Sequence, residues 1–142
     1  MSLIVSRETW LLRKQVGKTG KAKAKIGALG EQIAARFLEG KGFSVIGRNY
    51  WQKWGEIDLI AEDRAALRFV EVKTMERTEG ESFLPEENVH KEKLKRLFRT
   101  IHTYLDDKRE GEREWQLDVV AVIIDFKEKT ASVRFTENVL PE

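Results

Sequence analysis

The chain has 142 residues, of which 41% are hydrophobic and 35% charged, and its formal net charge is +2. This composition predicts one compact domain with an adequate core. The absence of cysteine excludes disulfides, thiol nucleophiles and cysteine-ligated zinc, and it favours a reducing cytoplasm. No stretch approaches 18 apolar residues and no signal peptide is indicated, so we expect no membrane association.

Charge is concentrated near the N-terminus. The first 25 residues hold seven Lys or Arg and one acid, Glu8, so they carry +6 and the remainder totals −4. We therefore divide the chain into a basic, flexible arm over 1–23 and a single domain over 24–142. Such an arm can lie on a phosphate backbone by releasing counterions, but an ordinary solubilising tail explains the same composition.

A helix is expected next, because apolar residues recur at helical spacing from Ile26 to Leu38. Gly27 and Gly30 lie within its apolar face, and such small residues let a helix approach a sheet closely. Glu31 falls on the border of that face. Its carboxylate either points towards the site described below, or is solvated or paired with Arg48.

Two short apolar segments carry charges where buried strands ordinarily carry none. They are residues 55–60 and 69–73. Because side chains alternate along a strand, Ile57 and Leu59 share one face of the first segment and Asp58 lies on the other. In the second segment, Glu71 and Lys73 share a face.

The polar link 62–65 suits a tight hairpin between these two strands. We expect Ala61 to pair with Ala66. Asp58 then lies diagonal to Glu71, at about 7–8 Å between Cα atoms. Their carboxylates would converge on one cation, with a lysine beside them.

This set of side chains suits metal-dependent hydrolysis of a phosphodiester. Mg²⁺ and Mn²⁺ prefer oxygen ligands, commonly one or two carboxylates, with water and phosphate oxygens completing the coordination. Lys73 can activate the attacking water or offset charge that develops on the phosphate. The alternative is a partly exposed Glu71–Lys73 pair on a solvated sheet face.

The rest of the chain supplies a loop, a helix and two strands. After a loop over 75–85, helical spacing predicts a helix from a cap at Asn88 to Leu105. A strand over 115–124, apolar enough to be buried on both faces, precedes a turn and a last strand over 130–135. This order predicts an α/β fold with a mixed central sheet of about five strands flanked by helices.

Three side chains have two interpretations each. Trp51 and Trp54 stack on an unpaired base at the mouth of the site, or at least one of them packs within the protein or an interface. Asp118, at the start of a strand, pairs with a basic residue or is simply solvated.

Six motifs are spread over residues 26–124. They are Gly27-x-x-Gly30-Glu31-x-x-Ala34, Gly42-Phe43, Arg48-Asn49-Tyr50, Gly55-Glu56-Ile57-Asp58-Leu59-Ile60, Phe69-Val70-Glu71-Val72-Lys73 and Leu117-Asp118-Val119-Val120-Ala121. Together they resemble the YraN-like family of small bacterial proteins, and Asp58 followed by Glu71-Val72-Lys73 resembles the PD-(D/E)-x-K nuclease signature. The resemblance implies a restriction-endonuclease-like fold, similar to that of archaeal Holliday-junction resolvases.

The resemblance also implies an endonuclease that uses Mg²⁺ or Mn²⁺. The expected metal ligands are Asp58, Glu71 and the backbone carbonyl of Val72. Lys73 would assist the water, and Glu31 would support the assembly. Other basic side chains would hold the backbone of a nucleic acid, DNA rather than RNA; they are Arg48, Arg77, Lys91 and Arg96. Junction or branched DNA is the implied substrate, and a symmetric homodimer is expected because two strands must be cut.

The chain departs from the family pattern at two places. The family usually has an Arg soon after the E-V-K-T sequence, where this chain has Met75-Glu76-Arg77, and an Arg-aromatic pair before the later Asp, where it has Gln116-Leu117. Arg77 is positioned to substitute for the first.

Two other functions remain open. One is a non-catalytic nucleic-acid-binding module that keeps the carboxylates as structural or weak metal groups. The other is a protein-interaction adaptor that uses its Trp residues and a short apolar piece of its arm, Thr9-Trp10-Leu11-Leu12. Metal-dependent cleavage lost in Lys73→Ala would support the enzyme, whereas salt-dependent DNA binding without cleavage would support the module.

Overall fold

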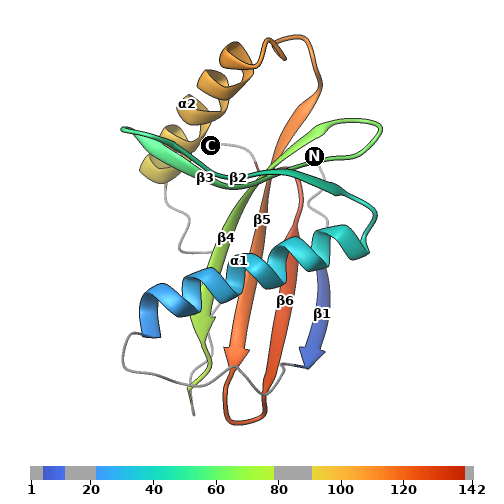
Figure 1. The fold of residues 1–142 in the computed structure, drawn as a ribbon, viewed down its shortest axis with the longest axis vertical. Coiled ribbons are helices and arrows are strands. Elements are labelled where there is room, and N and C mark those ends of the chain that lie inside the picture. Colours follow the sequence, from blue (N-terminus) through green and yellow to red (C-terminus); the bar gives the residue numbers. More distant parts are fainter. Residues whose placement is uncertain (1–4, 12–21, 79–90, 140–142) are drawn as a thin grey trace.

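The computed structural model describes residues 5–11, 22–78 and 91–139. The elements in chain order are β1 (Val5–Leu11), α1 (Ala22–Gly40), β2 (Ser44–Gln52), β3 (Gly55–Glu62), β4 (Leu67–Glu76), α2 (Lys91–Asp107), β5 (Trp115–Asp125) and β6 (Thr130–Thr136). The strands form one mixed sheet in the order β1-β6-β5-β4-β3-β2 (Figure 1). The structure is α/β with a restriction-endonuclease-like architecture, as expected.

The sheet has six described strands rather than about five. The additional strand is β1, which pairs antiparallel with β6 from Val5–Thr136 to Leu11–Thr130. Its residues fall in the segment that we assigned to the flexible basic arm, so part of that segment is an edge strand. The physical reason is that β6 offers a free edge to a run rich in β-branched and aromatic residues. Residues 12–21 of the arm lie outside the described residues.

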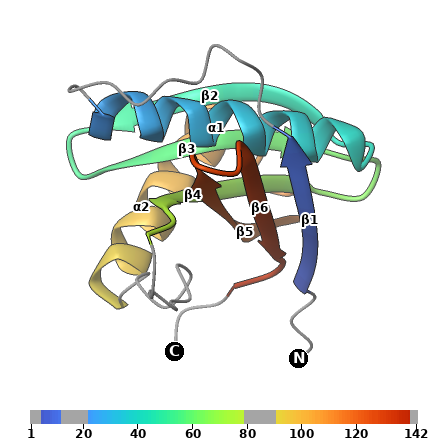
Figure 2. The ribbon, with the colours of Figure 1, turned by 90° about the horizontal axis from the view of Figure 1, so that it is seen from below.

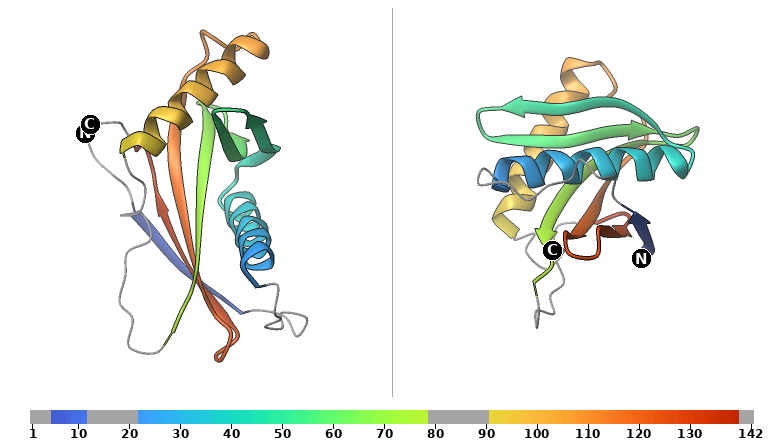
Figure 3. Two further views of the ribbon diagram at one scale, coloured as in Figure 1. Left: turned by 90° about the vertical axis from the view of Figure 1, so that its left-hand side faces the viewer. Right: turned by 60° about the horizontal axis from the view of Figure 1, so that its bottom comes forward.

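The two helices lie on opposite faces of the sheet (Figure 3). α1 packs on β4 and β5 with the apolar face expected from its spacing, including the buried Ile33 and Phe37. It also runs alongside the β2–β3 hairpin (Figure 2). No helix of the described part is long and apolar enough to cross a membrane.

α2 packs on β3 through a stripe of buried residues at the expected helical spacing. They are Leu94, Leu97, Thr100, Ile101 and Leu105. The predicted cap Asn88 lies outside the described residues, as does most of the predicted loop 75–85. That loop begins later than expected, because β4 stays paired with β5 as far as Glu76–Ile124.

β5 is the central strand, as expected from its continuous apolar run. It lies between β4, to which it is parallel, and β6, to which it is antiparallel. Its residues from Leu117 to Ile124 are all buried.

The β3–β4 hairpin differs in register from the expected one. Asp63 Oδ1 accepts hydrogen bonds from the backbone N–H groups of Ala65 (2.8 Å) and Ala66 (2.9 Å), which closes a loop over 63–66. Ala61 therefore pairs with Arg68, and not with Ala66. Because the shift is two residues, every side chain of β4 keeps its face.

The corrected register changes the position of Asp58. Continued by one residue, it puts Asp58 opposite Glu71 rather than diagonal to it. Alternation is also interrupted here, since Ile57 packs in the α2-side cluster and Leu59 in the α1-side cluster. The expectation that these two share a face is therefore wrong. The interruption lies at Asp58. The β2–β3 pairing includes Ile57 and Leu59 but not Asp58, and the β3–β4 pairing stops at Leu59.

Candidate functional site

A pocket of about 540 Å³ collects charged side chains from four elements. These are Glu31 of α1, Asp58 of β3, Glu71, Lys73 and Glu76 of β4, and Lys93 of α2. The four residues predicted to be catalytic therefore line one pocket, although they come from three different elements, α1, β3 and β4. Their roles in catalysis stay predictions.

The pocket lies at an open edge of β4. Pairing with β3 ends at Leu59–Val70, and among the described residues the rest of β4 pairs only with β5. The Val72 N–H on this edge donates to Asp58 Oδ2 at 2.8 Å. Since the N–H and C=O of a strand residue point to the same edge, the Val72 carbonyl faces it too. The open edge thus brings together the three ligands expected for a metal.

Two carboxylates of the pocket, the half-buried Asp58 and the buried Glu71, are near enough to affect each other's ionisation. Burial, and next the charge of Glu71, raise the pKa of Asp58 from 3.8 to about 8. Glu71 is only 4% exposed, and its Oε1 lies 2.9 Å from Lys93 Nζ. Neighbouring like charges disfavour ionisation unless a cation lies near both of them. The site is therefore suited to bind positive charge.

The donor set fits Mg²⁺ or Mn²⁺. Within the described ranges, no group of three or more His, Cys, Asp or Glu is arranged to hold a metal. Mg²⁺ does not require one, because it commonly binds through one or two carboxylates and keeps several waters. Asp58, Glu71 and the Val72 carbonyl match that demand.

Lys73 is half-buried on the wall of the pocket. Burial, together with the neighbouring Lys93, lowers its pKa, although Glu71 and Asp58 act in the opposite direction. A lysine with a lowered pKa is neutral for a larger fraction of the time and can then accept a proton. Burial also lowers the pKa of Lys93, but the hydrogen bond to Glu71, the contact with Lys73 and the charges of Glu71 and Asp58 together outweigh burial and raise the pKa overall.

Glu31 reaches the pocket because α1 lies very close to β4. A Cβ placed on Gly30 would be 1.9 Å from Thr74 Oγ1, so the helix backbone lies directly against the Thr74 side chain. With its amide nitrogen facing the acids, Asn49 donates to Glu31 Oε1 (2.9 Å) and Glu56 Oε1 (3.1 Å). Burial, and next the charge of Glu56, raise the pKa of Glu31. Its hydrogen-bonding partner is thus Asn49, and not the Arg48 of the alternative interpretation.

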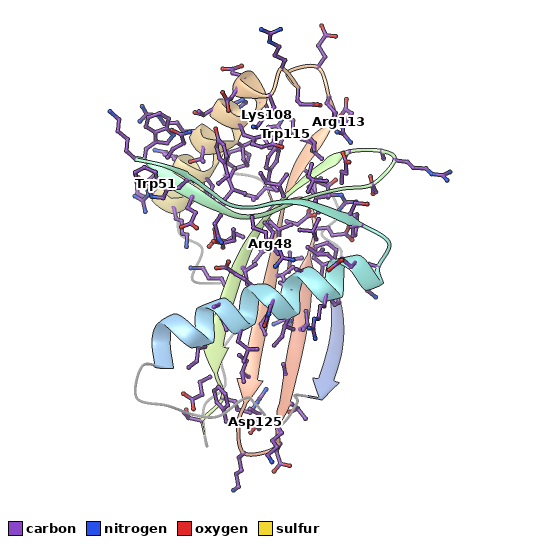
Figure 4. The ribbon with its side chains drawn as sticks, viewed as in Figure 1. Arg48, Trp51, Lys108, Arg113, Trp115 and Asp125 are labelled. Atoms are coloured by element: carbon purple, nitrogen blue, oxygen red, sulfur yellow. The ribbon has the colours of Figure 1, made fainter. Side chains whose placement is uncertain are left out.

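The four basic residues predicted to hold a nucleic acid are all exposed and do not line the pocket. They are Arg48, Arg77, Lys91 and Arg96. Arg48 lies on β2, on the side of the β2–β3 hairpin towards α1 (Figure 4). Its charge lowers the pKa of Glu31. Arg77 directly follows β4, and the other two lie in the first half of α2. Their role stays a prediction.

Two residues of the site were not singled out from the sequence. Lys93 was one of several lysines on α2, and only the docking of that helix identifies it as the partner of Glu71. Asn49 belongs to a noted motif, but its φ of 51° was not foreseen. Asn is among the few residues that tolerate this left-handed conformation, so an Asn inside a predicted strand is a usable signal.

The two tryptophans of the β2–β3 hairpin have different surroundings. Trp54 is half-buried, with the Arg99 guanidinium 4.2 Å from its ring centroid, so a structural role for one of the pair is supported. Trp51 is 68% exposed, at one end of the hairpin (Figure 4). Its stacking on a base stays a prediction.

Asp118 is fully buried, so the solvated interpretation is wrong. Its Oδ2 lies 3.0 Å from Arg68 NH1, and its Oδ1 accepts hydrogen bonds from Gln116 Nε2 (2.8 Å) and the Asn138 backbone N–H (2.9 Å). It is thus the partner of a basic residue, in a network separate from the pocket.

Comparisons with known proteins place the chain in a family. The family model described as "Uncharacterised protein family UPF0102" matches residues 30–122. A UPF0102 protein of Alkaliphilus oremlandii is 38% identical over 114 residues, which cover 80% of this chain and 96% of that protein. One of Beutenbergia cavernae is 44% identical over 103 residues, 72% of this chain and 86% of that protein. One of Pelotomaculum thermopropionicum is 35% identical over 117 residues, 82% of this chain and 96% of that protein. The chain therefore belongs to the UPF0102 family, which is the YraN-like family that its motifs resemble.

Proposed function

We propose that the chain is a metal-dependent endonuclease that hydrolyses phosphodiester bonds in DNA, with branched or junction DNA as its substrate. The observation that carries the proposal is the convergence of Asp58, Glu71 and Lys73 on one pocket at the open edge of β4. A buried and a half-buried carboxylate call for a cation, and the adjacent lysine has a lowered pKa. That combination suits hydrolysis of a phosphate ester.

The residues of the pocket have separate tasks. Asp58, Glu71 and the Val72 carbonyl would hold Mg²⁺ or Mn²⁺, which supplies positive charge to stabilise the negative charge that develops on the phosphate. Lys73 accepts a proton from the attacking water or donates a hydrogen bond to a phosphate oxygen. Glu31, oriented by Asn49, is placed to accept a hydrogen bond from water in the same pocket.

Exposed groups near the pocket support a nucleic acid as the substrate. Arg48 on β2 and Lys91 at the start of α2 add positive charge outside a pocket whose own wall is largely acidic. Such contacts to phosphates position a backbone without reading its sequence. The preference for DNA, the junction substrate and a symmetric dimer rest on the resemblance to junction resolvases.

A cleavage assay tests the proposal. Labelled linear, single-stranded, flapped and four-way-junction DNA would be incubated with Mg²⁺ or Mn²⁺ and wild-type protein, Asp58→Asn or Lys73→Ala. Asp58→Asn removes a charge but keeps an oxygen for the Val72 N–H. Lys108→Ala is the control, since this lysine directly follows α2, at the end of the helix opposite to Lys91, and does not line the pocket (Figure 4).

We expect both pocket variants to lose roughly a hundredfold or more in cleavage rate, the magnitude ordinarily supplied by general acid–base groups. Lys108→Ala should retain the wild-type rate. Equal cleavage by all four proteins would mean a different site or a contaminating nuclease. Binding of DNA without any cleavage would instead support the non-catalytic module.

A further inference from the structure

The pocket holds its own cation beside the predicted metal ligands. Lys93 Nζ lies 2.9 Å from Glu71 Oε1, and the side chains are 34% and 5% exposed respectively. The lysine comes from α2, on one face of the sheet, while Glu31 comes from α1 on the other. Among the described residues, Lys93 therefore supplies the ion pair of a carboxylate that is buried near Asp58.

A divalent cation at the same carboxylates would conflict with this arrangement. A metal bound to Glu71 would lie roughly 2 Å from a carboxylate oxygen. The ammonium of Lys93 would then be only a few ångströms from the metal, where like charges repel strongly in a partly buried site. Lys73 is close by as well, so the repulsion cannot be relieved by moving Lys93 towards it.

Lys93 is able to leave. Its ammonium ends a flexible four-carbon stem, and it can regain water when it moves because a third of its side chain is already exposed. Glu71, by contrast, belongs to a central region of β4 and is held by pairing with β5. The lysine is consequently the mobile member of the pair.

We propose that Lys93 is an internal counter-ion of Glu71 that a divalent cation must displace in order to bind. The inference rests on the proposed function, because it requires a metal at Asp58 and Glu71. It assigns to Lys93 the task of setting how tightly the metal is held. Lys93 neutralises Glu71 while no metal is bound, and loss of the lysine should therefore strengthen metal binding.

The test is calorimetric titration of the full chain with Mn²⁺, without DNA and at one mildly alkaline pH, so that the carboxylates are ionised. Lys93→Met removes the charge and keeps most of the stem, whereas Lys93→Arg keeps the charge. Lys95→Met is the matched control, since Lys95 lies on the same helix with its side chain 63% exposed and faces Glu92 at 3.8 Å. Asp58→Asn tests the metal site itself.

We expect Lys93→Met to bind Mn²⁺ about tenfold more tightly than wild type, since a charge-assisted hydrogen bond no longer has to be broken. Lys93→Arg and Lys95→Met should remain within about twofold of wild type. Circular dichroism and tryptophan fluorescence would check that each variant is folded, and Lys93→Gln gives a second neutral variant.

Any other result of the titrations contradicts either the role of Lys93 or the metal site itself. Unchanged or weaker Mn²⁺ binding in both Lys93→Met and Lys93→Gln, with binding still lost in Asp58→Asn, overturns this inference and leaves the proposed function standing. Absence of Mn²⁺ binding in wild type and in both neutral variants, or equal binding in Asp58→Asn, overturns the metal site and the inference together.

Discussion

Replacing Gly30 with alanine should destabilise the protein, although alanine is the better helix former. A Cβ at this position would lie 1.9 Å from Thr74 Oγ1, 2.6 Å from Cγ2 and 2.7 Å from Cβ. A rotation about χ1 moves the first two atoms but not the third. Either α1 must therefore move away from β4, or the strand must shift.

The magnitude follows from two opposing effects. Inserting a methyl group into a packed contact costs about 1–3 kcal/mol, and the upper half applies here because the obstacle is attached to the backbone. The helix propensity of alanine offsets about 1 kcal/mol. We therefore expect a net loss of about 1–2 kcal/mol in the free energy of unfolding.

Gly27 provides a matched control in the same helix. Within the described part of the chain, no atom outside the adjacent helix backbone lies within 4 Å of a Cβ built there, so Gly27→Ala should stabilise the protein by about 0.5–1 kcal/mol. The two variants make the same chemical change, so the difference between them isolates the contact with Thr74. That difference should be roughly 1.5–3 kcal/mol.

Equilibrium unfolding in urea, followed by tryptophan fluorescence, measures both variants. Gly30→Ala should also lower cleavage activity, because it displaces the adjacent Glu31 from the pocket. If Gly30→Ala proved as stable as Gly27→Ala, with the same denaturant dependence, the close approach of α1 to β4 would be refuted.

Three further predictions concern charge and exposure. The raised pKa of Asp58 means that the folded protein binds more protons than the unfolded chain between about pH 4 and 8. The free energy of unfolding should therefore fall as the pH rises across that window, by up to about 6 kcal/mol at 1.4 kcal/mol per pH unit. Urea titrations at several pH values should show a flatter pH profile for Asp58→Asn than for the wild type. Arg68→Met leaves the buried Asp118 without its cation and should lower the free energy of unfolding by about 3–5 kcal/mol. Arg113→Met breaks a half-exposed ion pair and should lower it by only about 0–1 kcal/mol, so similar melting temperatures for the two variants would contradict this prediction. Trp51→Ala should weaken binding of DNA that contains unpaired bases by about 1–3 kcal/mol and leave stability unchanged, and an undiminished affinity in a fluorescence-anisotropy titration would exclude stacking.

Several parts of the fold follow directly from local sequence patterns. The helical spacing from Ile26 to Leu38 and the apolar run in β5 predicted which faces are buried, because burial of a repeated face is a property of each segment by itself. The carboxylates and lysine of β3 and β4 were recognised for the same reason, since a charge inside an apolar strand needs a compensating partner.

Contacts between segments decided the remaining features. A side chain in the loop, Asp63, shifted the β3–β4 register by two residues, and the interruption at Asp58 moved Ile57 to the other face. Neither is visible in the periodicity of one strand. β1 joined the sheet because β6 had a free edge, which is a feature of the assembled sheet and not of the arm.

The chemical groups available to the pocket could be recognised from local sequence patterns: the two strand carboxylates, the adjacent lysine and the helical acid. Which other charges meet these groups depends on how the helices pack on the sheet. Lys93 faces Glu71 because α2 docks against β3, and Asn49 bridges Glu31 and Glu56 because α1 runs beside the β2–β3 hairpin. Electrostatic interaction depends on distance in space, and residues 22 positions apart, as Glu71 and Lys93 are, come within 2.9 Å only once the helices have packed on the sheet.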